Sequence, residues 1–421
     1  MTAGGPQRLL MEFGALWWAL AGMVSLAASA TPPSLKKEYS FGRSFLGLDK
    51  CNACVGTSIC KKFFKEEIRF EKWPSPRLQL PPINESTYLG YCTDSTESWR
   101  PAVLSRLIPH ELHELSDRSI CESVGREPTC SIEAVLRATP RFQSWAQSDL
   151  LLPHLVQGLA SPMLRCPSQR LLDRIVRRYT EVTDVGSILM KHFSERDKLR
   201  LLYTLAVNQH PLVLQMFPGT EGWPFPRYQG SCGRVIVHAG TRPLADLFGG
   251  ALATRADAAY QLLHMAESLR TNSLHFNLYY THVADDMFAT FEDGRVVIVD
   301  ASAIGIIDRL EELPQKAEPE RDHTDIFSCL GLSCKRALPC SSVRPSQSIM
   351  LLCQHPLPRL LLPQDLQGEA RHLLGICADP AQSDWSILAA ASKLMDVLRP
   401  LRPCSPRLSY RYPECTYSSQ F

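Results

Sequence analysis

The stretch YYTHVADDMFATFEDGRVVIVDAS, residues 279–302, decides the fold. It contains two short apolar runs, MFATF and RVVIVD, which are joined by Glu292-Asp293-Gly294. An Asp-Gly pair between two such runs favours a tight hairpin turn. The sequence therefore predicts a β-hairpin whose second strand ends on a carboxylate, Asp300.

The segments around this hairpin alternate between strand and helix patterns. Before it, residues 256–272 place apolar side chains at helical spacing, which predicts a long helix with one buried face. Residues 131–206 are also helical in pattern, and the tail has two further helical stretches, SQSIMLLC and DWSILAAASKLMDVLRPL. Three runs are interpreted as strands: WRPAVLSRLI at 99–108, PLVLQMF at 211–217 and GRVIVHAG at 233–240.

Composition limits the class of protein. The chain has 421 residues, of which 45% are hydrophobic and 21% charged, so it is long and apolar enough to bury a sizeable core. The formal net charge is +2, with acids and bases interspersed. This balance argues against a nucleic-acid partner and against disorder of the chain as a whole.

The N-terminus has the pattern of a secretory signal peptide. Arg8 precedes an apolar run over 15–26, and Ala28-Ser29-Ala30 resembles a small-residue cleavage site. The alternative is an uncleaved membrane anchor over 13–30. No later run is apolar enough to span a bilayer, and the C-terminal SSQF is no ER-retention signal. We therefore expect residues 1–30 to be removed and the mature protein to be secreted, through the ER and Golgi, or retained in the Golgi lumen.

Cysteine usage agrees with an oxidising compartment. All 15 cysteines follow the predicted signal peptide, and an odd number leaves at least one thiol unpaired or intermolecular. Cys51-x-x-Cys54 is the spacing of a zinc ligand pair, but no second matching pair follows, which favours disulfides. The sequon Asn84-Glu85-Ser86 predicts a glycosylated surface loop.

The order of elements, with a strand pair, a long helix, a loop and a hairpin ending on Asp, is similar to the centre of a protein kinase. The sequence resembles the divergent protein kinase domain family, and within it the subfamily of the deleted-in-autism-one protein and its related paralogue. The blocks that carry the resemblance are SFLGLDKCNACVGTSICKKFFKEEI, LVQGLASPMLRCPSQRLLDR, DKLRLLYTLAVN, GSCGR, VVIVDASAIGIID and RYPEC. The resemblance implies an α+β, bilobal, disulfide-rich kinase-like fold. We expect an N-lobe-like region over 31–240, with a helical insertion, and a C-lobe-like region over 241–421.

The resemblance assigns Asp300 to the position of the metal-binding Asp of kinases, although the motif reads Asp-Ala-Ser. Two interpretations stay open. Asp300 either binds Mg or Mn together with ATP, or caps a helix through AIGIIDRL. The two roles are compatible.

The catalytic loop departs from the kinase pattern. Met287 occupies the place of the metal-binding Asn and His282 that of the catalytic Asp. A Met thioether is a poor magnesium ligand, whereas a neutral His can accept a proton. Asp285 and Asp286 are the candidates to replace the missing carboxylates, and the alternative is a solvated acidic loop.

Four residues are candidates for the nucleotide side of the cleft. Gly56 is what remains of a glycine loop, or a turn between cysteines. Arg106 or Lys62 is the candidate phosphate-binding cation, and Glu133 the candidate acid of the first large helix. The alternatives are surface bases and a first-turn acid that interacts with the helix dipole.

The sequence leaves two main functions open. The missing catalytic-loop residues favour a secreted or Golgi-lumenal pseudokinase that acts as an extracellular signalling or scaffold factor on an unidentified protein partner. The alternative is an active atypical kinase that uses Mg/Mn-ATP on a protein or glycan acceptor. A weaker third hypothesis is a Golgi-resident chaperone-like factor.

Overall fold

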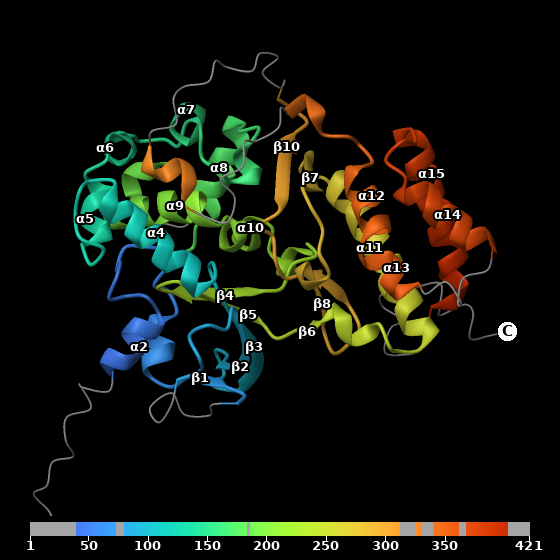
Figure 1. Ribbon diagram of the computed structural model, residues 1–421, viewed down its shortest axis with the longest axis horizontal. Helices are drawn as coiled ribbons and strands as arrows, with labels where there is room; N and C mark the ends of the chain where they lie inside the picture. Colours follow the sequence, from blue (N-terminus) through green and yellow to red (C-terminus); the bar gives the residue numbers. More distant parts are fainter. Residues whose placement is uncertain are drawn as a thin grey trace, which may run out of the picture.

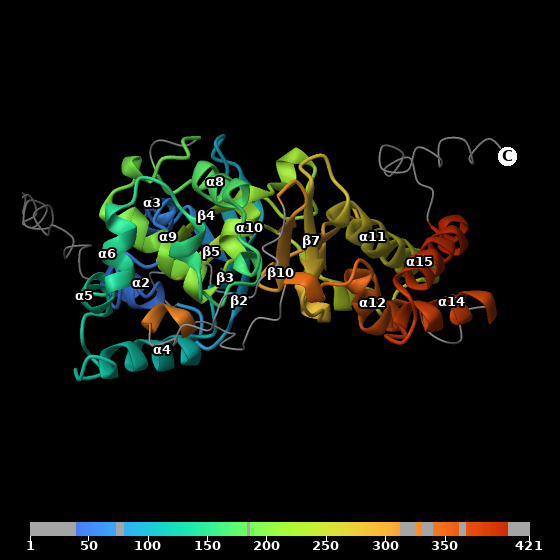
Figure 2. The same cartoon turned by 90° about the horizontal axis from the view of Figure 1, so that it is seen from above.

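The computed structural model describes residues 39–72, 80–182, 186–311, 325–330, 340–361 and 368–402. A five-stranded sheet and a group of helices form one end of the molecule, and helices α11 to α15 form the other (Figures 1 and 2). The predicted signal peptide, residues 1–30, lies outside the described residues and stays a prediction. Within the described ranges, every helix is too short or too polar to cross a membrane.

The five-stranded sheet is antiparallel throughout, with the order β1-β2-β3-β5-β4. Its strands are β1 Ile68–Phe70, β2 Thr87–Thr93, β3 Trp99–Arg106, β4 Tyr228–Cys232 and β5 Val235–Ala239. The predicted strands at 99–108 and 233–240 are confirmed as β3 and β5. One face of the sheet packs on two short helices, α2 Tyr39–Phe45 and α3 Cys60–Phe64, through a core that includes Phe45, Phe63 and Val237.

Seven helices lie between β3 and β4 in the described part of the chain, and five of them, α5 to α9, confirm the helical pattern predicted over 131–206. Four of them start at a Ser or Thr whose hydroxyl accepts a backbone N–H, which satisfies a donor that the first turn leaves free. Ten consecutive residues of α9, from Lys198 to Val207, are buried, so this helix lies at the centre of the larger core. The helices are α4 His110–Glu122, α5 Ile132–Arg137, α6 Pro140–Gln147, α7 Pro153–Val156, α8 Gln169–Arg178, α9 Glu195–Val207 and α10 His210–Met216.

The strand predicted at 211–217 is wrong, because these residues form α10. Every residue of this helix is buried, so its side chains show no alternation of apolar and polar positions. A short apolar run of this kind fits a buried strand and a buried helix equally well. The segment between α10 and β5 contains the edge strand β4.

The second half of the described chain contains the predicted hairpin. Strands β8 Phe288–Thr290 and β9 Val296–Ile298 pair antiparallel, and Gly294 has the positive φ of 79° that the turn requires. The predicted long helix is α11 Leu252–Arg270. The other elements are β6 Arg242–Pro243, β7 Phe276–Tyr280, β10 Ile304–Asp308, α12 Gln347–Gln354, α13 Pro356–Leu360, α14 Gly368–Ala378 and α15 Asp384–Leu398.

Eight single turns of 3₁₀ helix connect these elements. They are η1 Pro162–Leu164, η2 Met190–His192, η3 Gly219–Glu221, η4 Leu244–Leu247, η5 Asp285–Met287, η6 Ile326–Cys329, η7 Cys340–Ser342 and η8 Arg399–Leu401.

Five disulfides join described cysteines. They are Cys51–Cys54, Cys60–Cys232, Cys121–Cys130, Cys166–Cys340 and Cys353–Cys377. The Cys51-x-x-Cys54 pair is thus a disulfide and not a pair of zinc ligands. Cys92, buried in β2, is unpaired in this part of the chain.

Candidate functional site

Asp300 lies in the short connection between β9 and β10. The backbone N–H of Val299 donates to the carbonyl of Met287 at 2.9 Å, which ties this connection to the loop before β8. The Asp300 carboxylate is half-buried and accepts the backbone N–H of Ser302 through Oδ1 at 2.8 Å. This contact forms a tight turn between the two strands.

The predicted helix after Asp300 is wrong, so Asp300 is not a helix cap. Residues 304–308 form strand β10, which is buried along its whole length and pairs with β7. Three of its five residues are isoleucines, whose β-branched side chains favour a strand.

Two histidines lie behind the Asp300 turn. His210 starts α10, and its Nδ1 accepts the backbone N–H of Ala301 at 3.0 Å. Because Nδ1 accepts, the ring proton is on Nε2, which is buried without a partner among the described residues. Burial lowers the pKa of His210, although the negative charge of Asp300 acts in the opposite direction and raises it. Burial also lowers the pKa of His238, to about 4.

The two imidazole rings connect the Asp300 turn to the sheet. Their centroids are 6.5 Å apart in an edge-to-face arrangement, and His238 lies in β5. The neighbouring Gln209 amide donates to the carbonyls of Ala301 and Ile304, at 3.0 and 2.6 Å. Sequence reasoning missed this contact. The only available signal was the polar run Asn208-Gln209-His210 after the mainly apolar stretch LLYTLAV.

The catalytic-loop candidates point in different directions. The Met287 side chain is buried, and its sulfur accepts the Ala284 N–H at 3.3 Å. Asp285 forms an ion pair with Arg359 of α13, whereas His282 and Asp286 are exposed. Among the described residues, no group of three His, Cys, Asp or Glu side chains is arranged to hold a metal ion.

The loop at Gly56 surrounds a carboxylate of the chain itself. The backbone N–H groups of Thr57 and Ser58 both donate to Oε2 of Glu181 at 2.9 Å. The hydroxyls of Ser58 and Tyr228 donate to Oε1, at 2.7 and 3.0 Å. A Cβ at Gly56 would lie 2.0 Å from the Ser231 hydroxyl and 2.5 Å from the Glu181 carboxyl carbon, so a side chain at this position would displace these two groups.

The candidate cations Lys62 and Arg106 lie on the other face of the sheet from Asp300. Lys62 donates to the Thr93 carbonyl, and Arg106 donates to the Phe45 carbonyl at 3.1 Å while stacking on the Phe45 ring. Phe45 belongs to the core under α2 and α3, to which Val237 also points. Side chains alternate along a strand, so the next residue, His238, points to the opposite face, toward His210.

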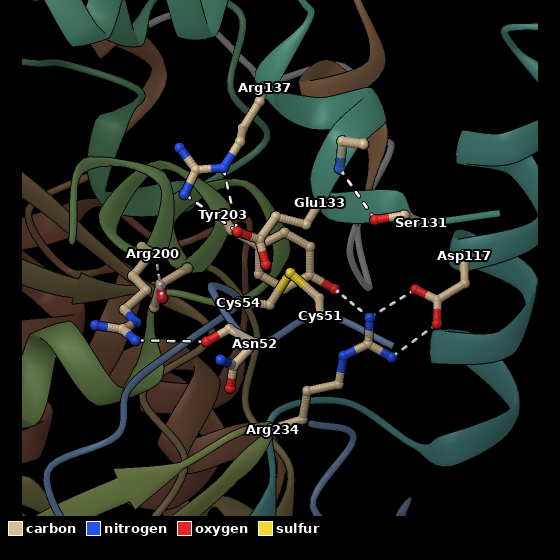
Figure 3. The surroundings of a disulfide bond; sticks show 12 residues. Cys51, Asn52, Cys54, Asp117, Ser131, Glu133, Arg137, Arg200, Tyr203 and Arg234 are labelled. Atoms are coloured by element: carbon tan, nitrogen blue, oxygen red, sulfur yellow. Dashed lines mark hydrogen bonds and ion pairs between the residues drawn. A yellow bond between two sulfur atoms is a disulfide. The ribbon is translucent and has the colours of Figure 1, made fainter. Parts of the chain in front are cut away.

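Within the described ranges, Glu133 forms no hydrogen bond or ion pair with these residues. It forms an ion pair with Arg137 one helical turn away at 3.1 Å, and Arg137 also contacts Glu195 at 3.2 Å. Figure 3 shows Glu133 beside the Cys51–Cys54 disulfide.

The buried ion pair that joins the sheet to a helix uses residues that sequence reasoning did not select. Arg234, just before β5, binds Asp117 of α4 through two hydrogen bonds of 2.9 and 2.6 Å (Figure 3). Arg234 also donates to the Tyr203 hydroxyl at 3.2 Å. Nearby, His113 is buried with both ring nitrogens unpartnered among the described residues, and burial, with the Arg234 charge, lowers its pKa. The sequence signal that could have indicated this ion pair was Arg234 at the end of the GSCGR block.

Comparison with known proteins identifies the family. Residues 202–380 match the family model described as the protein-kinase domain of FAM69. The chain is 52% identical to divergent protein kinase domain 2B of Homo sapiens, with 99% of each chain covered. It is 51% identical to the Mus musculus protein of that name, over 96% of this chain and 95% of the relative. Its identity to divergent protein kinase domain 2A of Homo sapiens is 34%, over 85% of this chain and 88% of the relative.

These matches confirm the resemblance drawn from the sequence and the kinase-like fold class. The division at residue 240 and the roles of the individual site residues stay predictions. The chain belongs to the divergent protein kinase domain family.

Proposed function

We propose that this chain is a pseudokinase of the secretory pathway, which acts as an extracellular signalling or scaffold factor by binding a protein partner. The observation that carries the proposal is the position of Glu181. In kinases the backbone of the glycine loop faces the nucleotide phosphates. Here the backbone N–H groups beside Gly56 bind the chain's own carboxylate, and a phosphate in the same place would meet that negative charge.

The loop before the Asp300 turn supports the same proposal. Met287, at the place of the second metal ligand, is buried and offers only a thioether. Magnesium prefers hard oxygen ligands. Asp285 is neutralised by Arg359, and both candidate cations lie on the opposite face of the sheet. These residues do not fit a magnesium–nucleotide site.

The location outside the cytosol is supported by two features. Five disulfides join described cysteines, and such bonds persist mainly in oxidising compartments. Asn84 of the sequon is exposed in a turn before β2, where a glycan has room.

The alternative is an active atypical kinase that uses Mg/Mn-ATP on a protein or glycan acceptor. One observation favours it. Asp300 follows the β8–β9 hairpin, as the metal-binding Asp of kinases does, and its carboxylate is only half-buried. In this alternative the exposed Asp286 is the second ligand.

Nucleotide binding decides between the two functions. A ligand at 100 times its Kd stabilises a protein by about 2.7 kcal/mol, which is visible as a rise in Tm. For glycosylated protein from a mammalian secretory host, we expect no rise with ATP and either magnesium or manganese. A rise that Asp300→Ala abolishes would favour the active-kinase alternative, with Asp300 as the metal ligand. A rise that survives this substitution would mean that the nucleotide site uses another carboxylate.

A further inference from the structure

A second site lies away from the Asp300 turn, between the end of α8 and the segment after α11. It is a cavity of about 340 Å³, at the lower end of the range of small-molecule sites. Its lining includes Arg174, Arg178, Glu221, Trp223, Thr271 and Ser273, and we call it the arginine pocket.

The arginine pocket is distinct from the kinase-like cleft. Its lining ends at Leu274, next to the start of β7, whereas the other end of β7, at Tyr280, pairs with the residues that follow the Asp300 turn. The five residues of β7 span roughly 13 Å between these two ends.

The arginines of the pocket carry more positive charge than the neighbouring acids neutralise. Arg178 forms two hydrogen bonds with Glu221, of 2.6 and 3.3 Å. Arg174 has no carboxylate partner in the described ranges and donates Nε and Nη2 to the Met216 carbonyl, at 3.1 and 2.6 Å. Burial and the charge of Arg178 lower the Arg174 pKa to about 10. An anion in the pocket would relieve this repulsion.

The other side chains of the lining suit a sugar ring. Trp223 is half-buried and presents an aromatic surface, on which the apolar side of a pyranose can pack. Thr271 and Ser273 are exposed and add hydroxyl groups at the rim. The guanidinium groups match a tetrahedral oxyanion in geometry and charge.

We propose that the arginine pocket binds a hexose that carries a sulfate or phosphate ester, with the ester on Arg174 and Arg178 and the ring against Trp223. Glu221 holds Arg178 in the empty pocket and is displaced by the ester. This inference does not depend on whether the kinase-like cleft binds nucleotide.

The test is calorimetric titration of the full mature chain with glucosamine 6-sulfate and with glucose 6-phosphate, and these two probes distinguish the two esters. We expect one or both esters to bind. The same sugars without the ester, glucosamine and glucose, and inorganic sulfate should each bind at least tenfold more weakly. Loss of a hydrogen-bonded charge partner typically weakens binding by about tenfold or more, which is the effect expected of Arg178→Ala. Glu221→Gln should strengthen binding, because it frees Arg178.

Arg177→Ala is the matched control. Arg177 is exposed on the same helix and does not line the pocket, so this variant removes the same charge outside the site. We expect the affinity of Arg177→Ala for the esters to differ from that of the wild-type protein by less than about twofold. If Arg177→Ala and Arg178→Ala lost the same amount of affinity for the esters, the loss would come from the net charge of the helix and not from the pocket, and the proposal would be overturned. Absence of binding by both esters, or equal binding of inorganic sulfate, would also overturn it. Unchanged Tm values verify that each variant is folded.

Discussion

At the residue scale, the loop around Gly56 depends on a side chain that lies 123 positions beyond Ser58. The Glu181 carboxylate accepts two backbone N–H groups and the hydroxyls of Ser58 and Tyr228. Hydrogen bonds to a charged acceptor are stronger than those between neutral groups. Glu181 therefore orders this loop, and in the proposed function it also fills the space that a phosphate group would need.

We expect Glu181→Ala to lower the free energy of unfolding by about 1–3 kcal/mol, because it leaves several donors without their acceptor. Urea denaturation measures the change. The control is Glu292→Ala, which removes an exposed acid from the hairpin turn and should change stability by less than about 0.5 kcal/mol. Equal stability of the two variants would mean that the Glu181 contacts do not hold the loop.

At the scale of elements, the sequence predicts those that carry a local signal, such as a helical period or a turn pair, and fails where no such signal is present. Apolar residues recur at helical spacing in α11, and an Asp-Gly turn joins the two apolar runs of the hairpin, whose strands are buried; both elements are confirmed. α10 is buried on all sides, so its run PLVLQM carries no period. β10 was predicted as a helix from a capping Asp, whereas its pairing with β7 decides its conformation.

The candidate site was predicted less well, because its residues are brought together by tertiary packing, which leaves no local pattern in the sequence. Sequence reasoning selected Asp300 from its place after the hairpin, and the structure has it there. It also grouped Lys62 and Arg106 with Asp300, although they lie on the other face of the sheet. A shift of one residue along a strand reverses the face, and no local pattern fixes this choice. Long-range partners, such as Asp117 for Arg234, are likewise set by tertiary packing.

Among the disulfides, Cys60–Cys232 joins elements that are distant in sequence. It connects α3 to β4 over 172 positions, whereas Cys51–Cys54 spans three. In the chain-entropy model, these loops correspond to about 5 and about 1.6 kcal/mol of stability. We expect Cys60→Ser to reduce secretion and Tm more than Cys51→Ser does.

The control for the disulfide prediction is Cys92→Ser. It makes the same replacement at the buried thiol, which is unpaired among the described cysteines, and leaves all five described disulfides intact. Secretion assays on conditioned medium and melting curves compare the three variants. A Cys60→Ser protein that is secreted and melts like Cys92→Ser would contradict the prediction.

At the scale of the whole molecule, buried histidines couple the fold to pH. His238 and His210 lie between the sheet and the Asp300 turn, and His113 lies beside the Arg234–Asp117 ion pair. Burial lowers the pKa of His238 to about 4 and also lowers the pKa of His113 and His210. The same imidazoles titrate near ~6.5 in an unfolded chain. Between these pH values the unfolded state binds more protons than the native state.

The free energy of unfolding should therefore be constant above about pH 6.5 and fall as the pH drops below it. Each buried histidine contributes at most about 1.4 kcal/mol per pH unit in this window. Urea denaturation at about pH 7.5, 6 and 5 measures the slope. His238→Gln should be less stable at every pH but should have a shallower slope, because one of the three buried groups no longer titrates. The control is His282→Gln, which makes the same replacement at an exposed side chain. A wild-type protein whose stability does not change between about pH 7.5 and 5 would show that these imidazoles take up protons equally well in the folded state.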